Sequence, residues 1–593
     1  MRSARWRGHL RRHKRMSEDQ NKTESKVEGH KKASYHLRGT IAETLRADAP
    51  AFDEADASLL KFHGVYQQDD RDVRQERRKA GLGEKTMFMV RLAIPGGALS
   101  AEQYLRLDEL VDRHEFRSMR VTTRQGIQFH GVLKHDLKET IAAVNRSLLT
   151  TLSACGDVER NVMTCPAPLA DRDHVRLREL ADAIARDLRP QSKAYFEIWL
   201  DEEKVATTEG EEPFYGDRYL PRKFKTGIAL ASDNCIDVYS YDCGLVAITE
   251  GPEIRGFNLV VAGGLGMTHN KPDTFAALGQ TVAFIEPAHA VEAVRAVCAV
   301  FRDYGNRVDR RHARLKYLLE QWGLDGFREA YERYVNFPLH PPVVLAEPGC
   351  DDHLGTHRQG DGRYFHGVYI ENGRIIDADG CRMRSALRTI MRELRPGVRL
   401  TPHQNMLLTD LTEAQVARVE ALLRDHGVRL AGELSAARRY SMACPALPTC
   451  GLAMAESERL MPSVVDAFEA ELTRLGLRDA PLTMRMTGCP NGCSRPYTAD
   501  IAFVGRKPDV YHVYVGGSLA GIRMADLFAA DVATEALVPT LRPLLEAWAR
   551  DRGVGESLGD YYQRLLAPAQ SRWKITGKED ETRGLVQLRL AGR

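Results

Sequence analysis

Apolar residues recur along this chain with two different periods. In one stretch they follow the three-and-four spacing of a helix with one buried face, at Leu177, Leu180, Ala181, Ile184 and Leu188. Between positions 120 and 132 apolar and polar residues alternate instead, as in a strand with one buried face. Because stretches of both kinds follow one another, the pattern predicts a mixed α+β fold.

Two segments resemble each other and indicate an internal duplication. Arg120-Val-Thr-Thr-Arg-Gln-Gly126 and Arg399-Leu-Thr-Pro-His-Gln-Asn405 share the arginine, a threonine and the glutamine. Each is followed by a Cys-Pro-Ala sequence, which begins 45 positions after the arginine in both copies (165 − 120 and 444 − 399). A third similarity joins the glycine-rich segments that follow Val261 and Val515. We expect two related halves that pack about a pseudo-two-fold axis, with the chemistry where they meet.

Length and charge exclude several classes of protein. A chain of 593 residues is too long for one hydrophobic core, so several domains are expected. The 84 lysines and arginines nearly balance the 81 acidic residues, which argues against a nucleic-acid-coating protein. The longest weakly charged stretches are too short for a membrane span. Any basic function must therefore belong to a local pocket.

The 11 cysteines and the amino-terminal residues bear on location. An odd number of cysteines, with no apolar signal segment, indicates a reducing compartment. Residues 1–15 hold seven arginines or lysines and no acid, which is compatible with a transit peptide. Met16, followed by Ser, Glu and Asp, looks like an ordinary cytosolic start. We expect a cytoplasmic protein, with organelle targeting as the alternative.

Four cysteines form two close pairs, Cys444 with Cys450 and Cys489 with Cys493. Prolines and glycines accompany both pairs, so their loops can turn several thiolates toward one centre. Five intervening residues are many for structural zinc, whereas an iron–sulfur cube tolerates wider loops. The spacing favours an iron–sulfur cluster; a non-catalytic scaffold stabilised by zinc, or inert buried thiols, are the alternatives. Cys165, the repeat partner of Cys444, either lies near the same pocket or is a remnant of the duplication.

Hydrogen-bond donors gather on one face of the alternating stretch. The even positions include Arg120, Thr122, Arg124, Gln128 and His130. A surface strand would normally include acids, and this face has none. A second run, Arg222-Lys-Phe-Lys225, sets two lysines opposite a phenylalanine, although a solvated strand end explains it equally well. Together the runs predict a polyanionic ligand.

The sequence contains no nucleotide fingerprint. There is no Gly-x-Gly-x-x-Gly after a strand, no P-loop and no evident flavin motif. A redox protein of this kind must receive its electrons from a partner.

These motifs resemble the sirohaem and [4Fe–4S] sulfite and nitrite reductase family, most closely its NADPH-dependent assimilatory branch. The resemblance covers roughly residues 35 to 560. The segments that carry it are Thr123-Arg-Gln-Gly-Ile-Gln-Phe-His-Gly131, Arg160-Asn-Val162, Pro221-Arg-Lys-Phe-Lys-Thr226, Ser441-Met-Ala-Cys-Pro-Ala-Leu-Pro-Thr-Cys450 and Thr487-Gly-Cys-Pro-Asn-Gly-Cys493. The paired-cysteine signature is the most specific of them.

The resemblance implies two coupled cofactors and a reaction. Sirohaem is an iron tetrapyrrole with eight carboxylates, which accounts for a face of basic residues without acids. The four paired cysteines hold the cluster, and Cys493 also bridges it to the sirohaem iron. The implied reaction is the six-electron reduction of sulfite to sulfide.

Matching positions also imply residue roles. The residues around the bound oxyanion are Arg91, Arg160, Lys223 and Lys225. Those that hold the macrocycle are Arg120, Thr122, Arg124, Gln128 and His130, with Gln404 and Asn491 as neighbours from the second half. Lysines crowded by like charges should have lowered pKa values, which would make both of these lysines proton donors as well.

Residues 1–35 are polar, charged and poor in aromatics, which predicts a disordered leader. An extended segment at 36–85 follows, and then a fold of three parts. Residues 86–150 and 346–430 form a two-part ferredoxin-like domain, 151–345 a sirohaem and substrate domain, and 431–593 an iron–sulfur domain with a tail. The implied partner is a separate NADPH-oxidising flavoprotein in a hetero-oligomer, with ferredoxin as the alternative donor. Nitrite reductases of the family tend to carry asparagine at the position of Lys225, so sulfite is the expected substrate and nitrite the alternative.

Overall fold

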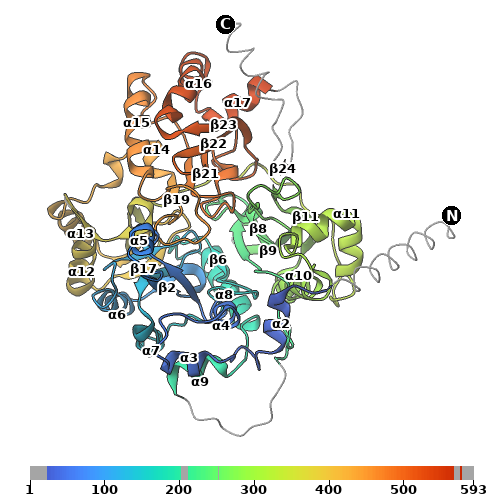
Figure 1. Cartoon of the computed structure of the whole chain (residues 1–593). Helices are drawn as coiled ribbons and strands as arrows, with labels where there is room; N and C mark the ends of the chain where they lie inside the picture. The colour runs from blue at the N-terminus through green and yellow to red at the C-terminus, as the bar shows by residue number, and fades with distance from the viewer. Residues whose placement is uncertain (1–22, 202–211, 252, 379, 567–573, 577–593) are drawn as a thin grey trace, which may run out of the picture.

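The computed structural model describes residues 23–201, 212–251, 253–378, 380–566 and 574–576 (Figure 1). Residues 1–22 of the expected disordered leader lie outside this part. For the rest of that leader the prediction of disorder is wrong, because helix α2 (Lys26–Lys32) forms there. Its Lys31 and Glu28 are buried as an ion pair, and Arg307 also pairs with Glu28 at 2.6 Å. These contacts bind the polar segment to the body of the protein.

Two five-stranded sheets repeat one arrangement. The first has the order β1 (Val65–Asp69), β2 (Thr86–Arg91), β5 (Ile127–Val132), β4 (Met119–Val121) and β14 (Arg374–Ile375). The second has the order β12 (Gly355–Arg358), β13 (Tyr364–Val368), β18 (Met406–Leu411), β17 (Gly397–Leu400) and β3 (Ala98–Leu99). Each sheet takes its last strand from the other half of the chain, so the two copies are interlocked.

Two further five-stranded sheets share a second arrangement. One has the order β6 (Met163–Thr164), β7 (Thr226–Leu230), β8 (Cys243–Glu250), β9 (Glu253–Val261) and β11 (Gln280–Ile285). The other has the order β19 (Ser441–Ala443), β20 (Met484–Thr487), β21 (Ile501–Lys507), β22 (Val510–Val515) and β23 (Asp526–Ala533). In both, two parallel pairings are followed by two antiparallel ones. The predicted duplication and the mixed α+β class are confirmed.

Helices cover these sheets, and equivalent helices recur in the two halves. Those of the first half are α3 (Ile41–Arg46), α4 (Glu54–Leu59), α5 (Arg74–Lys79), α6 (Ala101–Val111), α7 (Leu137–Arg146), α8 (Arg172–Asp187), α9 (Ala194–Leu200), α10 (Ala290–Tyr304) and α11 (Leu315–Tyr331). Those of the second are α12 (Met383–Leu394), α13 (Glu413–Asp425), α14 (Ala436–Arg439), α15 (Met461–Arg474), α16 (Leu537–Asp551) and α17 (Leu558–Leu566). In the described part, no helix is long and apolar enough to cross a membrane.

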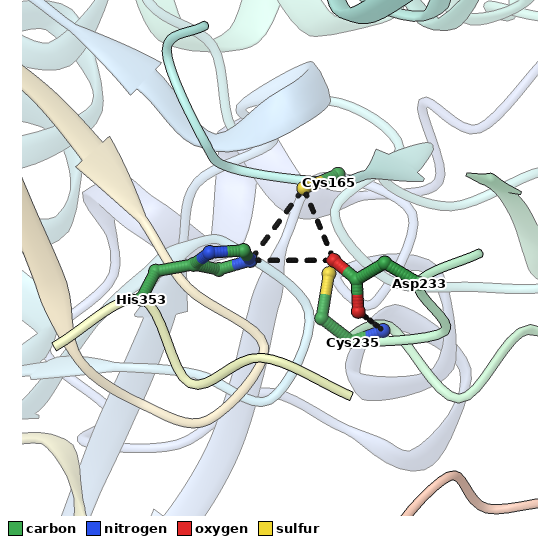
Figure 2. Close-up of side chains that lie close together, drawn as sticks. All are labelled: Cys165, Asp233, Cys235 and His353. Atoms are coloured by element: carbon green, nitrogen blue, oxygen red, sulfur yellow. Dashed lines mark hydrogen bonds and ion pairs between the residues drawn. The ribbon is translucent and has the colours of Figure 1, made fainter. Parts of the chain in front are cut away.

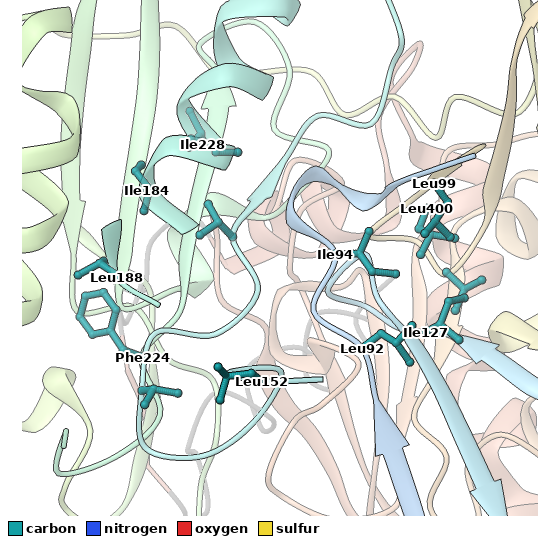
Figure 3. Packing of buried hydrophobic residues seen from close by; sticks show 14 of the residues in the cluster. Leu92, Ile94, Leu99, Ile127, Leu152, Ile184, Leu188, Phe224, Ile228 and Leu400 are labelled. Carbon is teal, nitrogen blue, oxygen red and sulfur yellow. The ribbon is translucent and has the colours of Figure 1, made fainter. Parts of the chain in front are cut away.

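Two short pairings complete the strands. β10 (Phe275–Ala277) pairs with β24 (Lys574–Thr576), and β15 (Asp377–Ala378) pairs with β16 (Cys381–Arg382). The main hydrophobic core runs through both ferredoxin-like sheets and the sheet of β6 to β11. Figure 3 shows Leu99 and Leu400 of the two halves side by side in it. The carboxyl-terminal sheet has a separate core, around Phe468 and Trp548.

The alternating stretch from 120 to 132 is a hairpin rather than one strand, which corrects the sequence interpretation. Between β4 and β5 the Thr122 hydroxyl accepts hydrogen bonds from the backbone N–H groups of Arg124 and Gly126, at 3.2 and 3.1 Å. This side-chain bonding closes a tight turn. Arg120 and Gln128 are direct cross-strand partners. The predicted face of hydrogen-bond donors is therefore formed by two paired strands.

The same turn recurs in the second half. Thr401 accepts from the backbone N–H of Asn405 at 3.0 Å, as Thr122 does from Gly126. Gln125 and Gln404 both have positive φ angles, 50° and 67°. The Gln125 amide bonds the backbone of Thr164, and the Gln404 amide bonds that of Ala443. Thr164 and Ala443 directly precede Cys165 and Cys444. The equal separation of 45 residues therefore reflects the same contact in both halves, between the turn glutamine and the backbone next to the cysteine.

Candidate functional site

The four paired cysteines lie in two neighbouring loops. Cys444 follows β19 and Cys489 follows β20, and these strands are parallel partners. Because the carboxyl ends of parallel strands lie at one edge of a sheet, the two loops meet. Burial, together with the nearby Cys444 and Cys493, raises the pKa of the Cys450 thiol to about 11. Burial and two of the same neighbours raise the pKa of Cys489 to about 12.

Donors already point at these sulfur atoms. The Thr487 hydroxyl and the Gly488 backbone N–H donate to Cys444 Sγ at 3.5 and 3.3 Å. Asn491 Nδ2 donates to Cys489 Sγ at 3.5 Å, which places this predicted residue beside the thiols. Hydrogen bonds of this kind stabilise thiolates that ligate an iron–sulfur cluster and tune its potential.

The closeness of possible ligand atoms bears on the choice between zinc and a larger group. In a tetrahedral zinc site the sulfur atoms lie about 3.8 Å apart, because each Zn–S bond is about 2.3 Å long. The described residues whose ligand atoms approach within 4.8 Å of one another are a different group, Cys165, Asp233, Cys235 and His353. Among the described residues no three of the paired cysteines meet that criterion, so their thiols are not gathered as closely as the ligands of one zinc ion, which is compatible with a larger group.

Cys493 differs from the other three cysteines in its exposure. Cys444 and Cys489 are buried and Cys450 is half-buried, whereas Cys493 is exposed. The first half of the chain reaches this loop, since Thr123 Oγ1 donates to the Cys493 carbonyl at 3.1 Å. Arg495 Nη1 in turn donates to the carbonyl of Thr123 at 3.0 Å. One thiol of the set therefore faces open space at the junction of the two halves, as a bridge to a second group requires.

The lysine run lies within electrostatic reach of that thiol through Lys223. Phe224 is fully buried, and its backbone pairs with Val158 and Arg160, which fixes the two flanking lysines relative to Arg160. Burial lowers the pKa of Lys223 to about 7, with Arg160 and other cations adding to the effect and Cys493 opposing it. The pKa of Lys225 is also lowered, first by burial and then by Lys223. The predicted direction is confirmed, although burial outweighs the like charges.

Within the described part, the Nζ of Lys223 and that of Lys225 take part in no hydrogen bond or ion pair. Arg160 is partly used, since its Nε and Nη2 donate to the Gly156 carbonyl at 3.2 and 3.1 Å. The pocket therefore contains two ammonium groups with unfilled hydrogen-bonding capacity. An anionic guest supplies the acceptors that these groups need.

Arg124 has donors to spare as well. It lies with its guanidinium 4.7 Å from the centre of the Tyr241 ring, and its Nη2 donates to backbone carbonyls, including that of Thr226 at 3.0 Å. Its Nε and Nη1 are buried without a partner among the described residues. Leaving buried donors unpaired is costly, so these atoms fit a carboxylate-bearing group.

A chain of polar groups links Arg91 to His130. Arg91 Nε lies 2.8 Å from the side-chain oxygen of Gln128 in the favoured amide orientation, and Arg91 Nη1 donates to Cys155 Sγ at 2.9 Å. The other end of the Gln128 amide lies 3.4 Å from His130 Nε2. Burial and nearby arginines hold the pKa of His130 well below its usual value, so this ring is neutral. Its Nδ1 has no partner among the described residues.

Three residues predicted to bind the cofactor make their hydrogen bonds to other protein groups instead. Thr122 closes the hairpin turn. Arg120 donates to the carbonyls of Asn372 and Ala443 and pairs with Glu458 at 3.0 Å. Gln404 donates to the same Ala443 carbonyl at 3.0 Å. Arg120 and Gln404 thus hold the backbone next to Cys444, which is a positioning task.

Sequence reasoning missed Arg314, whose charge also lowers the pKa of both lysines. Its Nε and Nη2 pair with Asp242 at 3.0 and 2.8 Å. It belongs to no motif, and only the packing of α11 against β11 and its neighbours brings it to the site. Arg222 also contributes, and its place in the lysine run was the signal for it.

A four-thiol loop pair near a cluster of half-buried cations, on a duplicated fold, defines an oxidoreductase that couples an iron–sulfur cluster to an anionic cofactor. The chain belongs to the nitrite and sulphite reductase family. The family's 4Fe-4S domain matches residues 179–339 and 435–566, and its ferredoxin-like half domain matches 81–147 and 356–426. Its cofactors are therefore sirohaem and a [4Fe–4S] cluster, and the donors described above fit both.

Relatives agree with this assignment. The chain is 42% identical to the "Sulfite reductase [NADPH] hemoprotein beta-component" of Staphylococcus saprophyticus, over 90% of this chain and 94% of that protein. It is 45% identical to the protein of the same name from Methylobacterium sp. strain 4-46, over 90% and 89%. Among solved structures, the NirA protein of Mycobacterium tuberculosis matches with a TM-score of 0.75 at 25% identity, covering 91% of this chain and 96% of that one.

Proposed function

We propose that this chain is the catalytic haemoprotein of a sulfite reductase, which reduces sulfite to sulfide with six electrons. The observation that carries the proposal is the half-buried pair Lys223 and Lys225, whose ammonium groups have no protein acceptor in the described part. Lys223 also lies within electrostatic reach of Cys493. Relatives at 41–45% identity carry the name of an NADPH sulfite reductase haemoprotein, which supports the same substrate.

The oxyanion is bound by Arg91, Arg160, Lys223 and Lys225 in this proposal. Preorganised cations stabilise the charge of a bound sulfite without reorganisation during the reaction. Three oxygens must leave as water, so each departing oxygen needs protons. A lysine whose pKa is lowered to about 7 can donate a proton near neutral pH and regain it from solvent, which suits Lys223 to this task.

The cofactor residues follow from the donors that remain free. Arg124 and His130 would bind carboxylates of sirohaem directly, with Gln128 orienting His130. Arg120, Thr122 and Gln404 would act by holding the backbone around the site, and Asn491 by bonding Cys489. Cys444, Cys450, Cys489 and Cys493 would ligate the cluster, with Cys493 shared between the cofactors. When bound, these cofactors supply the electrons and the iron that holds sulfur.

The electron donor in this proposal is an NADPH-oxidising flavoprotein subunit, so the working enzyme is a hetero-oligomer. The name "beta-component" of the relatives and the lack of a nucleotide fingerprint in this sequence support it. Ferredoxin is the alternative donor. We place the protein in the cytoplasm, and we retain the proposed division into domains at 86–150 with 346–430, 151–345 and 431–593.

A steady-state comparison of sulfite and nitrite tests the substrate. The purified holoenzyme is assayed without oxygen, with reduced viologen as the donor, and sulfide and ammonia are measured directly. We expect both anions to be reduced, with the higher kcat/KM for sulfite. A preference for nitrite would replace the proposal by nitrite reduction, and the absence of turnover with both would remove it.

A further inference from the structure

Four metal-binding side chains meet at a place that the proposed reaction does not use (Figure 2). Cys165 follows β6, Asp233 and Cys235 lie in the loop after β7, and His353 precedes β12. The group therefore joins three segments that are distant in the sequence. Figure 2 shows the sulfur of Cys165, the ring of His353 and the carboxylate of Asp233 facing one another. Cys165 is therefore one of the four members of this group. From the sequence alone it is either a neighbour of the Cys444 pocket or a remnant of the duplication.

The distances match those between the ligands of one tetrahedral ion. Cys165 Sγ lies 3.5 Å from His353 Nε2 and 3.8 Å from Asp233 Oδ2. His353 Nε2 lies 3.6 Å from Asp233 Oδ2. Tetrahedral zinc with the usual bond lengths separates its sulfur, nitrogen and oxygen ligands by about 3.4–3.8 Å. All four ligand atoms, Cys235 Sγ included, lie within 4.8 Å of one another.

The atoms that do not face the centre are held by further groups. Asp233 Oδ1 accepts from the backbone N–H groups of Cys235 and Asp351, both at 3.1 Å, which leaves Oδ2 toward the other ligands. His353 Nδ1 lies 3.7 Å from Asp351 Oδ2, so Nε2 is the nitrogen turned inward. A carboxylate behind the second ring nitrogen is the usual support of a histidine that ligates zinc.

The surroundings are largely apolar, although His174 also hydrogen-bonds Cys165. Cys165, Cys235 and His353 are 3%, 1% and 6% exposed, and the two cysteines belong to a hydrophobic cluster with Met163, Val246 and Val260 among its members. Placing two thiols, an imidazole and a carboxylate together in such a place is unfavourable unless their charges are compensated. A divalent cation compensates two thiolates, and thiolate with imidazole is the ligand set that zinc prefers.

We propose that Cys165, Asp233, Cys235 and His353 bind one Zn²⁺ ion with a structural role. The ion ties the segment before β12, which begins the second ferredoxin-like sheet, to the sheet of β6 to β11. Four protein ligands leave no open position for a substrate, and zinc has no redox chemistry that would divert electrons. The site is thus separate from the reducing centre and persists whichever oxyanion the enzyme reduces.

Metal analysis of the wild-type holoenzyme is the first test. The protein is purified from cells grown with zinc and without chelators, and zinc is measured separately from iron. We expect about one zinc per chain, as for a closed structural site. Zinc-edge X-ray absorption should show two sulfur ligands at about 2.3 Å and two nitrogen or oxygen ligands at about 2.0–2.2 Å. Zinc well below one per chain, a different ligand set, or a Cys165–Cys235 disulfide found by mass spectrometry would overturn the proposal.

Variants then assign the ion to these residues. Cys165→Ala and His353→Ala should each lower bound zinc at least about tenfold, because each removes a ligand. Cys298→Ala is the matched control, since Cys298 is equally buried, in α10 and outside this group, and it should keep the full zinc content. Full zinc retention in both ligand variants would show that the ion binds elsewhere. Because the wild-type spectrum already separates a site with two sulfur ligands from the four-cysteine loops, a variant that fails to fold does not leave the question open.

Discussion

At the scale of single residues, Lys225 is the position at which we expect sulfite and nitrite to be discriminated. Sulfite near neutral pH is partly a dianion, whereas nitrite carries a single charge, so an additional cation favours sulfite. One such contact contributes about 1–3 kcal/mol, or roughly tenfold to a hundredfold in specificity. We therefore expect Lys225→Asn to lower the ratio of kcat/KM for sulfite to that for nitrite by about this factor.

The control for this experiment is Lys193→Asn, because Lys193 is exposed at the start of α9 and is not among the proposed site residues. Its ratio of specificities should equal that of the wild type. An unchanged ratio in Lys225→Asn, with intact cofactor absorbance, would show that this lysine does not select the substrate.

Lys223 predicts a dependence on pH. Burial, with Arg160 and its neighbours, lowers the pKa of this lysine to about 7, so it is a cation below that pH and loses its charge above it. Nitrite keeps one charge throughout this range and isolates the effect on the enzyme. We expect the KM for nitrite to rise as the pH increases through 7, by up to about tenfold for the loss of one contact.

The matched variant for the pH experiment is Lys223→Arg, because arginine stays protonated in this range. Its KM should lack the rise above pH 7. Bound carboxylates and substrate favour the charged lysine, so they displace the rise toward higher pH and leave its direction unchanged. A wild-type KM that is flat from pH 6 to 10 would contradict the role of Lys223.

At the scale of elements, the repeated turn offers a comparison within one molecule. Gln404 bonds both backbone groups of Ala443, next to Cys444, and Gln125 bonds both backbone groups of Thr164, next to Cys165. Replacing Gln125 by alanine removes the partners of the Thr164 backbone groups, and replacing Gln404 removes the partner of the Ala443 N–H, whereas the Ala443 carbonyl still accepts from Arg120. A buried group left unpaired costs about 1–3 kcal/mol. We expect both variants to lower Tm, while only Gln404→Ala also lowers the content of acid-labile sulfide. Equal loss of sulfide in both would show that the effect is global.

The elements also show what the sequence could predict. The periods of two and 3.6 residues identify strands and helices, and the motif separation in Arg120 to Cys165 revealed the duplication. The hairpin at Thr122 was missed because its hydroxyl bonds to the backbone, which alternation does not encode. The exchange of β3 and β14 between sheets, the helix α2 and the place of Arg314 depend on contacts between distant segments. Such contacts leave no local pattern.

At the scale of the whole molecule, Glu458 joins the two halves electrostatically. It pairs with Arg374 at 2.6 Å and with Arg120 at 3.0 Å. Burial alone would raise the pKa of this carboxyl, but the two guanidinium groups hold it below its ordinary value of 4.5. Glu458→Gln leaves two largely buried cations without their counter-charge, so we expect a loss of about 3–5 kcal/mol in the free energy of unfolding.

The pH dependence of that loss has a definite sign. Because the folded-state pKa lies below the unfolded value, the stabilisation from Glu458 is fully present above pH 4.5 and is lost as the pH falls through the folded-state pKa. Denaturant unfolding of the wild type and of Glu458→Gln should therefore differ most at neutral pH and converge in acid. A difference that grows as the pH falls would contradict the pairing.

Electron delivery is the last property of the whole molecule that can be tested. Leu452, two residues after the half-buried Cys450, is 67% exposed, so this loop brings the cluster close to the surface. Electron transfer from a separate protein requires such an approach. We expect NADPH-driven sulfite reduction only when an NADPH-oxidising flavoprotein is added, and we expect Leu452→Asp to weaken it at least severalfold. Viologen-driven turnover should be unaffected, because a small donor needs no docking surface.

Leu148→Asp is the matched control, because Leu148 is 90% exposed but follows α7, far from the cysteine loops in the sequence. It should leave both assays unchanged. Activity with reduced ferredoxin and none with the flavoprotein would reassign the donor while leaving the reaction intact, since viologen still reports on the reducing centre. A loss of viologen activity in Leu452→Asp would instead mean that the cluster loop itself is disturbed. The two assays together therefore separate docking from catalysis.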